Sequence, residues 1–184
     1  MQYNAIFKLK SEETIFNILS DTLLTMNYEI VRVKIVHNAQ VEILIEKTTG
    51  ETVSVDETAK VARYIKPLLY QGNAILNNDQ NFSPMEYSYD ISSCGIEKPL
   101  TRQKDLLNSI NKIVSIKLYR KITDKNGLKF KKLEGELVKL IDTGVVIQHN
   151  SEEISISFDN ISEITLVYVP WRVKNHSSRK IKKK

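Results

Sequence analysis

The sequence predicts an α+β fold in two parts, an N-terminal α-β-β-α-β domain followed by a small C-terminal β-barrel. Residues 11–93 alternate between segments with the apolar spacing of helices and segments with the alternation of strands. Residues 112–169 instead contain five short strand-like segments with tight turns between them, a pattern typical of small barrels. Hydrophobic residues make up 41% of the 184-residue chain, which is enough for a packed core.

The first helix is expected over residues 11–26. Ile15, Leu19 and Leu23 recur at intervals of four and form one apolar face. Ser11 is expected to cap the helix, and the two glutamates that follow it suit the positive end of the helix dipole.

Two strands are expected next, at 28–36 and 41–46. In the first, Val31, Val33 and Ile35 alternate with polar residues. The second has the same period of two, so each strand is expected to bury one face. A short loop joins the two strands, which predicts an antiparallel hairpin.

A second helix and a third strand complete the predicted N-terminal domain. In SVDETAKVARYIKPLL, Ser54 and Glu57 fit a capping box. Pro67 is expected to end or kink this helix. Residues 71–85 are polar and predict a loop, and residues 86–92 alternate as a strand. The two helices are expected on one face of a small mixed sheet.

Five strands are expected in the second part of the chain, with turns at Asn126–Gly127, Asp142–Gly144 and His149–Asn150. Gly135 lies inside the second strand, where it predicts a bend or bulge. A short helix capped by Thr101 is expected before the first strand. This arrangement favours an SH3-like, or Sm-like, barrel. The strands are expected at 112–122, 128–141, 144–148, 152–158 and 163–169.

Positive charge is concentrated toward the C-terminal end. The formal net charge is +5, yet residues 1–100 carry 9 basic and 13 acidic residues. From Trp171 onward, WRVKNHSSRKIKKK contains 7 basic residues and no acidic residue. Such a tail favours an anionic polymer as partner, with salt-sensitive affinity. The alternative is a solvated tail that only improves solubility.

The strongest candidate binding site is the predicted hairpin KLYRKITDKNGLKFKK, in which Asp124 is the only acidic residue. Alternate residues of a strand share a face, so several cations are expected to project together with Tyr119. Such a surface can contact RNA phosphates and stack on a base. The alternative is a lysine-rich edge that prevents aggregation. The candidate RNA-binding residues are Lys117, Arg120, Lys121, Lys125, Lys129, Lys131 and Lys132 in the hairpin, and Arg172, Lys174, Arg179 and Lys180 in the tail.

The residue patterns of common enzymes are missing from the sequence. His37, His149 and His176 are far apart, and no Cys/His pair has ligand spacing, so we expect neither a metal nor a cofactor. No P-loop pattern is present. Cys94 has Lys98 as its nearest base, which favours a small residue in a turn over a nucleophile. We therefore expect no catalytic residue.

The sequence also predicts the cellular compartment of the protein. A single cysteine cannot form an internal disulfide, which favours a reducing compartment. The first ten residues contain no apolar run of signal-peptide length. No window approaches the roughly 18–20 apolar residues of a membrane-spanning helix. We expect a cytoplasmic monomer that is not bound to a membrane.

Three segments carry a resemblance to a known family. NYEIVRVKIV and VEILIEK lead into the helix TVSVDETAKVARYI, and EEISISFDNISEITLVYVP ends the chain's predicted barrel. Between them a strand ends in Ser92, Ser93, Cys94, Gly95, Ile96, Glu97, Lys98, Pro99 and Leu100. In these features the chain resembles the RimP family of bacterial ribosome maturation factors, whose corresponding strand ends in S-S-P-G-hydrophobic-D-R-P-L. Here cysteine, glutamate and lysine replace the family's proline, aspartate and arginine.

The resemblance implies domains at 1–98 and 99–170, the second an SH3-like barrel. It does not account for the basic tail at 171–184. The segment from Ser92 to Leu100 would orient the connection between the domains, with Gly95 permitting a turn. The implied function is non-enzymatic: binding the free small (30S) ribosomal subunit during its maturation, through ribosomal RNA and small-subunit ribosomal proteins.

Two other hypotheses stay open. One is an Sm-like RNA-binding regulator that acts on free RNA. The other is a thiol enzyme centred on Cys94. The acidic excess of residues 1–100 would in addition suit a basic ribosomal protein as partner.

Overall fold

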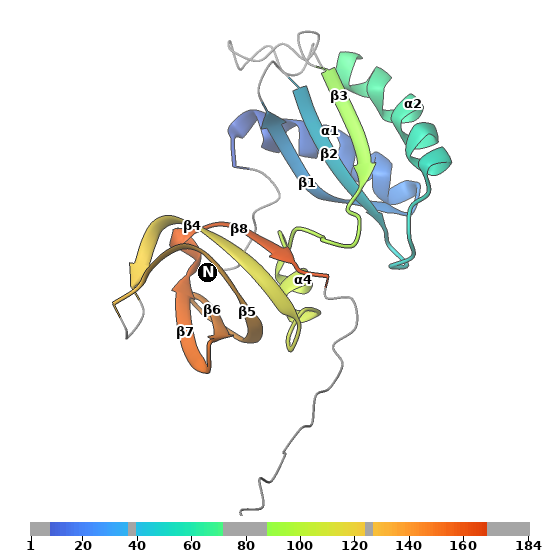
Figure 1. Ribbon diagram of the computed structural model, residues 1–184. Helices are drawn as coiled ribbons and strands as arrows, with labels where there is room; N and C mark the ends of the chain where they lie inside the picture. Colours follow the sequence, from blue (N-terminus) through green and yellow to red (C-terminus); the bar gives the residue numbers. More distant parts are fainter. Residues whose placement is uncertain (1–7, 37–39, 72–87, 124–126, 169–184) are drawn as a thin grey trace, which may run out of the picture.

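Two separate β-sheets, each with its own hydrophobic core, make up the computed structural model, which describes residues 8–36, 40–71, 88–123 and 127–168 (Figure 1). The chain completes the first sheet with its helices and then crosses to the second. The predicted α+β class is confirmed. Most of the predicted loop at 71–85 and of the turn before Gly127 lies outside the described residues.

The N-terminal region has the predicted α-β-β-α-β order. Its elements are α1 (Lys10–Thr25), β1 (Tyr28–Val36), β2 (Gln40–Lys47), α2 (Val55–Gln71) and β3 (Ser88–Ser93). β1 pairs antiparallel with β2, and β2 pairs parallel with β3, so the sheet is mixed with the order β1-β2-β3. Parallel neighbours need a long crossover connection, and α2 lies in that connection.

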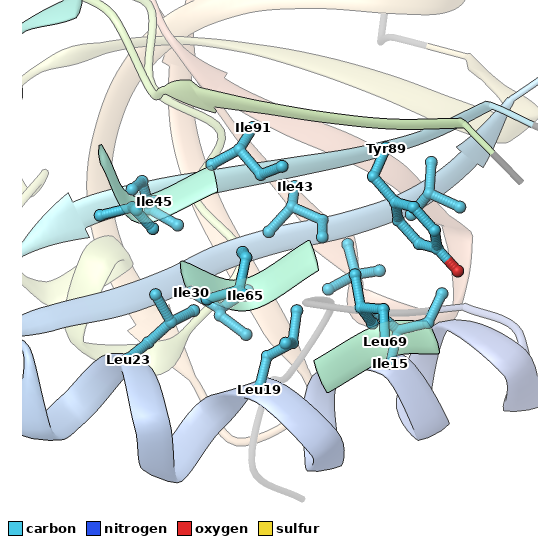
Figure 2. Close-up of a cluster of buried hydrophobic side chains, with 13 residues drawn as sticks. Ile15, Leu19, Leu23, Ile30, Ile43, Ile45, Ile65, Leu69, Tyr89 and Ile91 are labelled. Atoms are coloured by element: carbon cyan, nitrogen blue, oxygen red, sulfur yellow. The ribbon is translucent and has the colours of Figure 1, made fainter. Parts of the chain in front are cut away.

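Both helices pack on the same face of this sheet, as predicted (Figure 2). The four-residue spacing along each helix places one apolar row against the strands. The strands contribute side chains at alternate positions. The buried residues of this core are Ile15, Leu19 and Leu23 from α1, Val61, Ile65 and Leu69 from α2, and Ile30, Val33, Val41, Ile43, Ile45, Tyr89 and Ile91 from the sheet.

Glu12, and not the predicted Ser11, completes the start of α1. One carboxylate oxygen of Glu12 accepts hydrogen bonds from the backbone N–H groups of Lys8 (2.5 Å) and Leu9 (3.0 Å). The other accepts from the N–H of Ile35 on β1 (2.8 Å). Glu12 is only 3% exposed. The three backbone donors therefore replace the hydrogen bonds to water that its carboxylate loses on burial.

The prediction that Val31, Val33 and Ile35 share one face of β1 is wrong for Val31, because a β-bulge interrupts the alternation there. Ile30 pairs with Ile45 and Arg32 pairs with Leu44, which leaves Val31 as an extra residue. Ile30 and Val33 therefore face the core, whereas Val31, although fully buried, does not belong to it. A bulge interrupts the ladder, and the freed Val31 carbonyl accepts a hydrogen bond from the Thr101 hydroxyl.

Helix α2 begins as predicted but continues past Pro67. The Ser54 hydroxyl accepts from the N–H of Glu57 (3.2 Å), and the Glu57 carboxylate accepts from the N–H of Ser54 (2.8 Å), which is the expected capping box. Pro67 lies inside the helix, which ends at Gln71. Proline removes the bond to the carbonyl four residues earlier, but Arg63 and Pro67 are both exposed, so water can reach that carbonyl.

The C-terminal region contains the five predicted strands in one antiparallel sheet of order β7-β6-β5-β4-β8. It begins with a short helix, α4 (Gln103–Leu107), and has a 3-10 turn, η3 (Phe158–Asn160), before the last strand. Its buried core is centred on Ile116, Leu133 and Leu137. The strands are β4 (Ile113–Thr123), β5 (Lys129–Ile141), β6 (Gly144–His149), β7 (Glu152–Ser157) and β8 (Ile161–Leu166).

The predicted barrel is not closed. Within the described residues no strand pairing joins β7 to β8, so these two strands form the sheet edges. The outer edge of β8 bonds instead to the segment that enters this region. Leu100 N–H donates to the carbonyl of Ile164 (2.8 Å), and Leu166 N–H donates to the carbonyl of Lys98 (2.9 Å). That edge is therefore not available to β7.

Two further local predictions are corrected. Thr101 does not cap α4, whose N-cap is Arg102, because its hydroxyl is used by the β1 bulge. Gly135 pairs in register with Val114 and forms no bulge. A Cβ atom at Gly135 would lie 2.5 Å from the carbonyl oxygen of Gln148 on β6, so glycine is needed here for close approach of two strands.

Replacing Glu12 by glutamine should destabilise the N-terminal region by about 1–3 kcal/mol, since a buried amide cannot accept the same three N–H bonds. The free energy of unfolding in urea measures this. Glu13→Gln, one position along and exposed, is the matched control and should change stability by less than about 0.5 kcal/mol. Equal effects of the two variants would show that the Glu12 bonds do not stabilise the fold.

Candidate nucleic-acid interface

Basic residues gather along the hairpin formed by β4 and β5. On β4, Ile116 and Leu118 point into the core, and the alternate residues Lys117, Tyr119 and Lys121 are exposed. Lys132 is the cross-strand partner of Lys117. We define the basic hairpin surface as Lys117, Tyr119, Arg120, Lys121, Lys129, Lys131 and Lys132, all of which are exposed.

Some of these cations are neutralised within the protein. Lys117 and Lys132 face each other across the ladder, an arrangement of like charges that is unfavourable. Each is compensated: Lys117 binds Glu163 on β8 (2.6 Å), and Lys132 binds Glu134 (3.1 Å). These two lysines therefore have a role within the sheet itself.

Four cations of the surface remain for a partner. Arg120, Lys121, Lys129 and Lys131 make no ion pair with the described part of the chain. The structure thus brings together the predicted hairpin residues and separates them into paired and available charges. The predicted Lys125 and the tail residues Arg172, Lys174, Arg179 and Lys180 lie outside the described residues.

Tyr119 gives the surface an aromatic platform. The side chain is 55% exposed, so its ring is accessible. The ammonium group of Lys8 lies 5.5 Å from the ring centroid, in cation–π distance. Lys8 also donates to the backbone carbonyl of Ser162. Sequence reasoning missed Lys8 because it is more than a hundred residues away from the hairpin.

The segment from Ser92 to Leu100 connects the two sheets. Ser92 and Ser93 end β3. Gly95 has φ = +63°, a conformation that favours glycine. Pro99 forms an isolated antiparallel bridge with Thr165 of β8, and Leu100 is buried in the C-terminal core.

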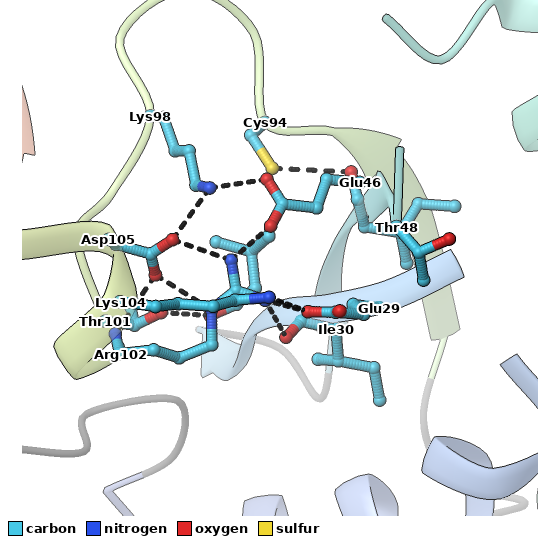
Figure 3. A network of polar contacts seen from close by, with 12 residues as sticks. Glu29, Ile30, Glu46, Thr48, Cys94, Lys98, Thr101, Arg102, Lys104 and Asp105 are labelled. Atoms are coloured by element: carbon cyan, nitrogen blue, oxygen red, sulfur yellow. Dashed lines mark hydrogen bonds and ion pairs between the residues drawn. The ribbon is translucent and has the colours of Figure 1, made fainter. Parts of the chain in front are cut away.

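Arg102 lies at the centre of a polar network that joins the two regions (Figure 3). Its guanidinium donates two hydrogen bonds to Asp105, both 2.8 Å. It also contacts Glu29 of β1 (2.9 Å) and Glu46 of β2. Lys98 binds both Glu46 and Asp105, the latter at 2.8 Å. Arginine suits this position because its planar fork can bind several carboxylates at once.

Sequence reasoning named Lys98 but missed Arg102, Glu29 and Glu46. One local signal was available, since Arg102 and Asp105 are three residues apart at the start of a short helix. Their partners on β1 and β2 are more than fifty residues away, and no periodicity connects them.

Electrostatics keep this network charged. Burial alone would raise the pKa of Asp105, but hydrogen bonds from Arg102 and Lys98 outweigh it and lower that pKa. Burial likewise opposes the charged form of Lys98, yet its bonds to Asp105 and Glu46 raise its pKa overall. A lowered carboxylate pKa contributes stability at neutral pH that is lost as pH falls through the folded-state pKa. The junction therefore weakens in acid.

The surroundings of Cys94 favour its neutral thiol form. Its Sγ donates to the carbonyl oxygen of Ile45 (3.3 Å). Burial, followed by the negative charge of Glu46, raises its pKa to about 11. A thiolate is the nucleophilic form, so this environment opposes the chemistry that a thiol enzyme needs. Among the described residues no group of three His, Cys, Asp or Glu side chains could hold a metal ion.

The fold and the surface together define a class: an α+β protein in which a mixed α/β region is joined by an ion-pair network to an antiparallel sheet with a basic outer face. No helix in the described residues is long and apolar enough to cross a membrane. Residues 18–97 match the family model of the RimP N-terminal domain. This match assigns residues 18–97 to a RimP N-terminal domain and so supports a place in the RimP family of ribosome maturation factors.

Arg102→Met should lower the free energy of unfolding by about 3 kcal/mol, because it leaves the buried Asp105 carboxylate without its main partner. Lys104→Met is the matched control: it removes another contact to Glu29, but from a side chain that is 50% exposed rather than 12%. The control should cost less than about 1 kcal/mol. Urea unfolding compares the two, and similar losses would contradict a central role for Arg102.

Alkylation of Cys94 by iodoacetamide at pH 8 should be roughly a hundredfold slower in the folded protein than in the urea-unfolded chain, because raising a thiol pKa by two units lowers the thiolate fraction about that much. Mass spectrometry of quenched samples gives both rates. Rapid alkylation of the folded protein would instead support the thiol-enzyme hypothesis.

Proposed function

We propose that the protein is a non-enzymatic assembly factor that binds the free 30S ribosomal subunit during its maturation. The carrying observation is the RimP N-terminal domain in a chain whose β4–β5 hairpin has four exposed cations that make no ion pair with the described residues. The basic hairpin surface contacts ribosomal RNA through phosphates, and Tyr119 offers a ring on which an unpaired base can stack. Binding free energy then favours one folded state of the particle over others.

The proposal includes a division of the chain into domains at 1–98 and 99–170, followed by the tail at 171–184. The strand order β7-β6-β5-β4-β8 and the 3-10 turn before β8 support an SH3-like class for the second domain. The acidic excess of residues 1–100 suits a basic small-subunit protein as a second contact. The protein acts in the cytoplasm as a monomer.

A second candidate function uses the same surface. A basic strand face with an exposed tyrosine would also suit an Sm-like regulator of free RNA. Sedimentation of cell extract on a sucrose gradient distinguishes the two. An assembly factor migrates with free 30S subunits and not with mature ribosomes, whereas a regulator of free RNA stays near the top of the gradient.

Changing Lys121 and Lys131 together to glutamine should weaken binding to purified 30S subunits and make it less dependent on salt. The slope of log affinity against log salt should fall by roughly 0.7–0.9 for each phosphate contact removed. Binding at four or five salt concentrations measures the slope. Lys139→Gln, an exposed lysine at the other end of β5, is the control and should leave the slope unchanged.

Deleting residues 172–184 tests the tail in the same assay and should also flatten the slope. If neither the hairpin variant nor the deletion changes the slope, the basic residues do not contact RNA and the proposed function loses its main support.

A further inference from the structure

We propose that the RNA-binding surface does not end at the C-terminal sheet but continues onto the N-terminal region. There Lys8, just before α1, and Lys34 of β1 bind an RNA phosphate at the mouth of a cleft between β1 and β8. This inference rests on the proposed function and deepens it. It makes the ligand a bridge between the two regions of the protein.

The cleft lies at the junction of the two sheets. Its volume is about 200 Å³. Lys8, Arg32 and Lys34 line it from the N-terminal region, and Pro99, Ser162 and Ile164 line it from the other side. Glu12 and Glu163 also line the cleft. Both carboxylates already accept bonds from donors of the protein, which leaves the positive charge of Lys8 and Lys34 at the cleft for a phosphate group.

The contacts of Glu163 show that the electrostatic potential at the cleft is positive. Its two carboxylate oxygens bind Arg32 of β1 (3.0 Å) and Lys117 of β4 (2.6 Å). Burial would raise its pKa, but the hydrogen bond from Lys117 and the charges of Lys117, Arg32 and Lys34 lower it instead. A negative group is thus favoured at this place by cations from both regions of the protein.

Two of the surrounding cations have no carboxylate partner in the described part of the chain. Lys34 is exposed and makes no ion pair there. The Lys8 ammonium binds the Ser162 carbonyl and lies over the ring of Tyr119. Lys8 therefore links the cleft to Tyr119 of the basic hairpin surface.

A purely structural role explains only part of this cluster. Arg32 and Glu163 connect the two regions, and a third carboxylate, Glu42, lies 3.7 Å from Arg32. Glu12, which also lines the cleft, is occupied by its three backbone N–H donors. Lys34 makes none of these bonds. It lies opposite Glu42 across the β1–β2 ladder and its charge acts on Glu163, but its side chain is exposed and can reach a further anionic partner.

The test is the salt dependence of binding for Lys34→Gln, measured on purified 30S subunits and on the RNA extracted from them. The slope of log affinity against log salt should fall by roughly 0.7–0.9, as expected for one phosphate contact, and Lys34→Glu should give a larger fall. Because Lys34 is exposed and makes no ion pair with the described part of the chain, the urea midpoint should move little. Lys60→Gln, an exposed lysine on α2, is the control and should have no effect.

The outcomes separate this inference from the proposed function. If Lys121→Gln with Lys131→Gln lowers the slope and the Lys34 variants do not, the inference is overturned and the proposed function stands. If Lys34→Gln acts on intact subunits but not on the extracted RNA, the partner at the cleft is a ribosomal protein, and the inference is again overturned. If neither set of variants lowers the slope, both fail.

Discussion

The contact between Arg102 and three carboxylates is the interaction on which the arrangement of the molecule depends. Each sheet has its own hydrophobic core, so hydrophobic burial alone would leave the two regions free to choose their relative orientation. Arg102, Lys98 and Lys104 meet Glu29, Glu46 and Asp105, an equal number of opposite charges. Paired charges in a partly buried site demand particular geometry, and the network therefore specifies one orientation.

Hydrogen bonds of the backbone reinforce the same junction. The β1 bulge releases the Val31 carbonyl to Thr101, and the segment around Pro99 adds itself to the edge of β8. The connection is thus built into both sheets. An edge strand that is covered in this way does not pair with other chains. The connecting segment thus covers the edge of β8 that would pair with β7 in a closed barrel.

Charge is used for two different purposes on the two sides of this junction. Around Arg102 the charges are balanced and hold the regions together. Along β4 and β5, Arg120, Lys121, Lys129 and Lys131 face solvent without partners in the described residues. Surface cations of this kind contribute little to folding, so their concentration along the β4–β5 hairpin is better explained by a partner with the opposite charge. Lys117 belongs to both groups, since it is exposed and also bound to Glu163.

The sequence by itself determined the elements of this protein, because helices and strands follow from local spacing. The rows Ile15–Leu19–Leu23 and Val41–Ile43–Ile45 predicted which faces are buried, and the Ser54–Glu57 capping box predicted where α2 begins. The basic hairpin was also visible, since its run of basic residues around one turn can be read directly from the sequence.

Tertiary structure decided what depends on residues far apart in the chain. The Val31 bulge, the use of Thr101 as a donor and the continuation of α2 through Pro67 each reverse a local preference. The Arg102 network and the meeting of Lys8 with Tyr119 join residues separated by fifty or more positions. Local patterns carry no information about such contacts, because their free energy is gained only after both sheets have formed and come together.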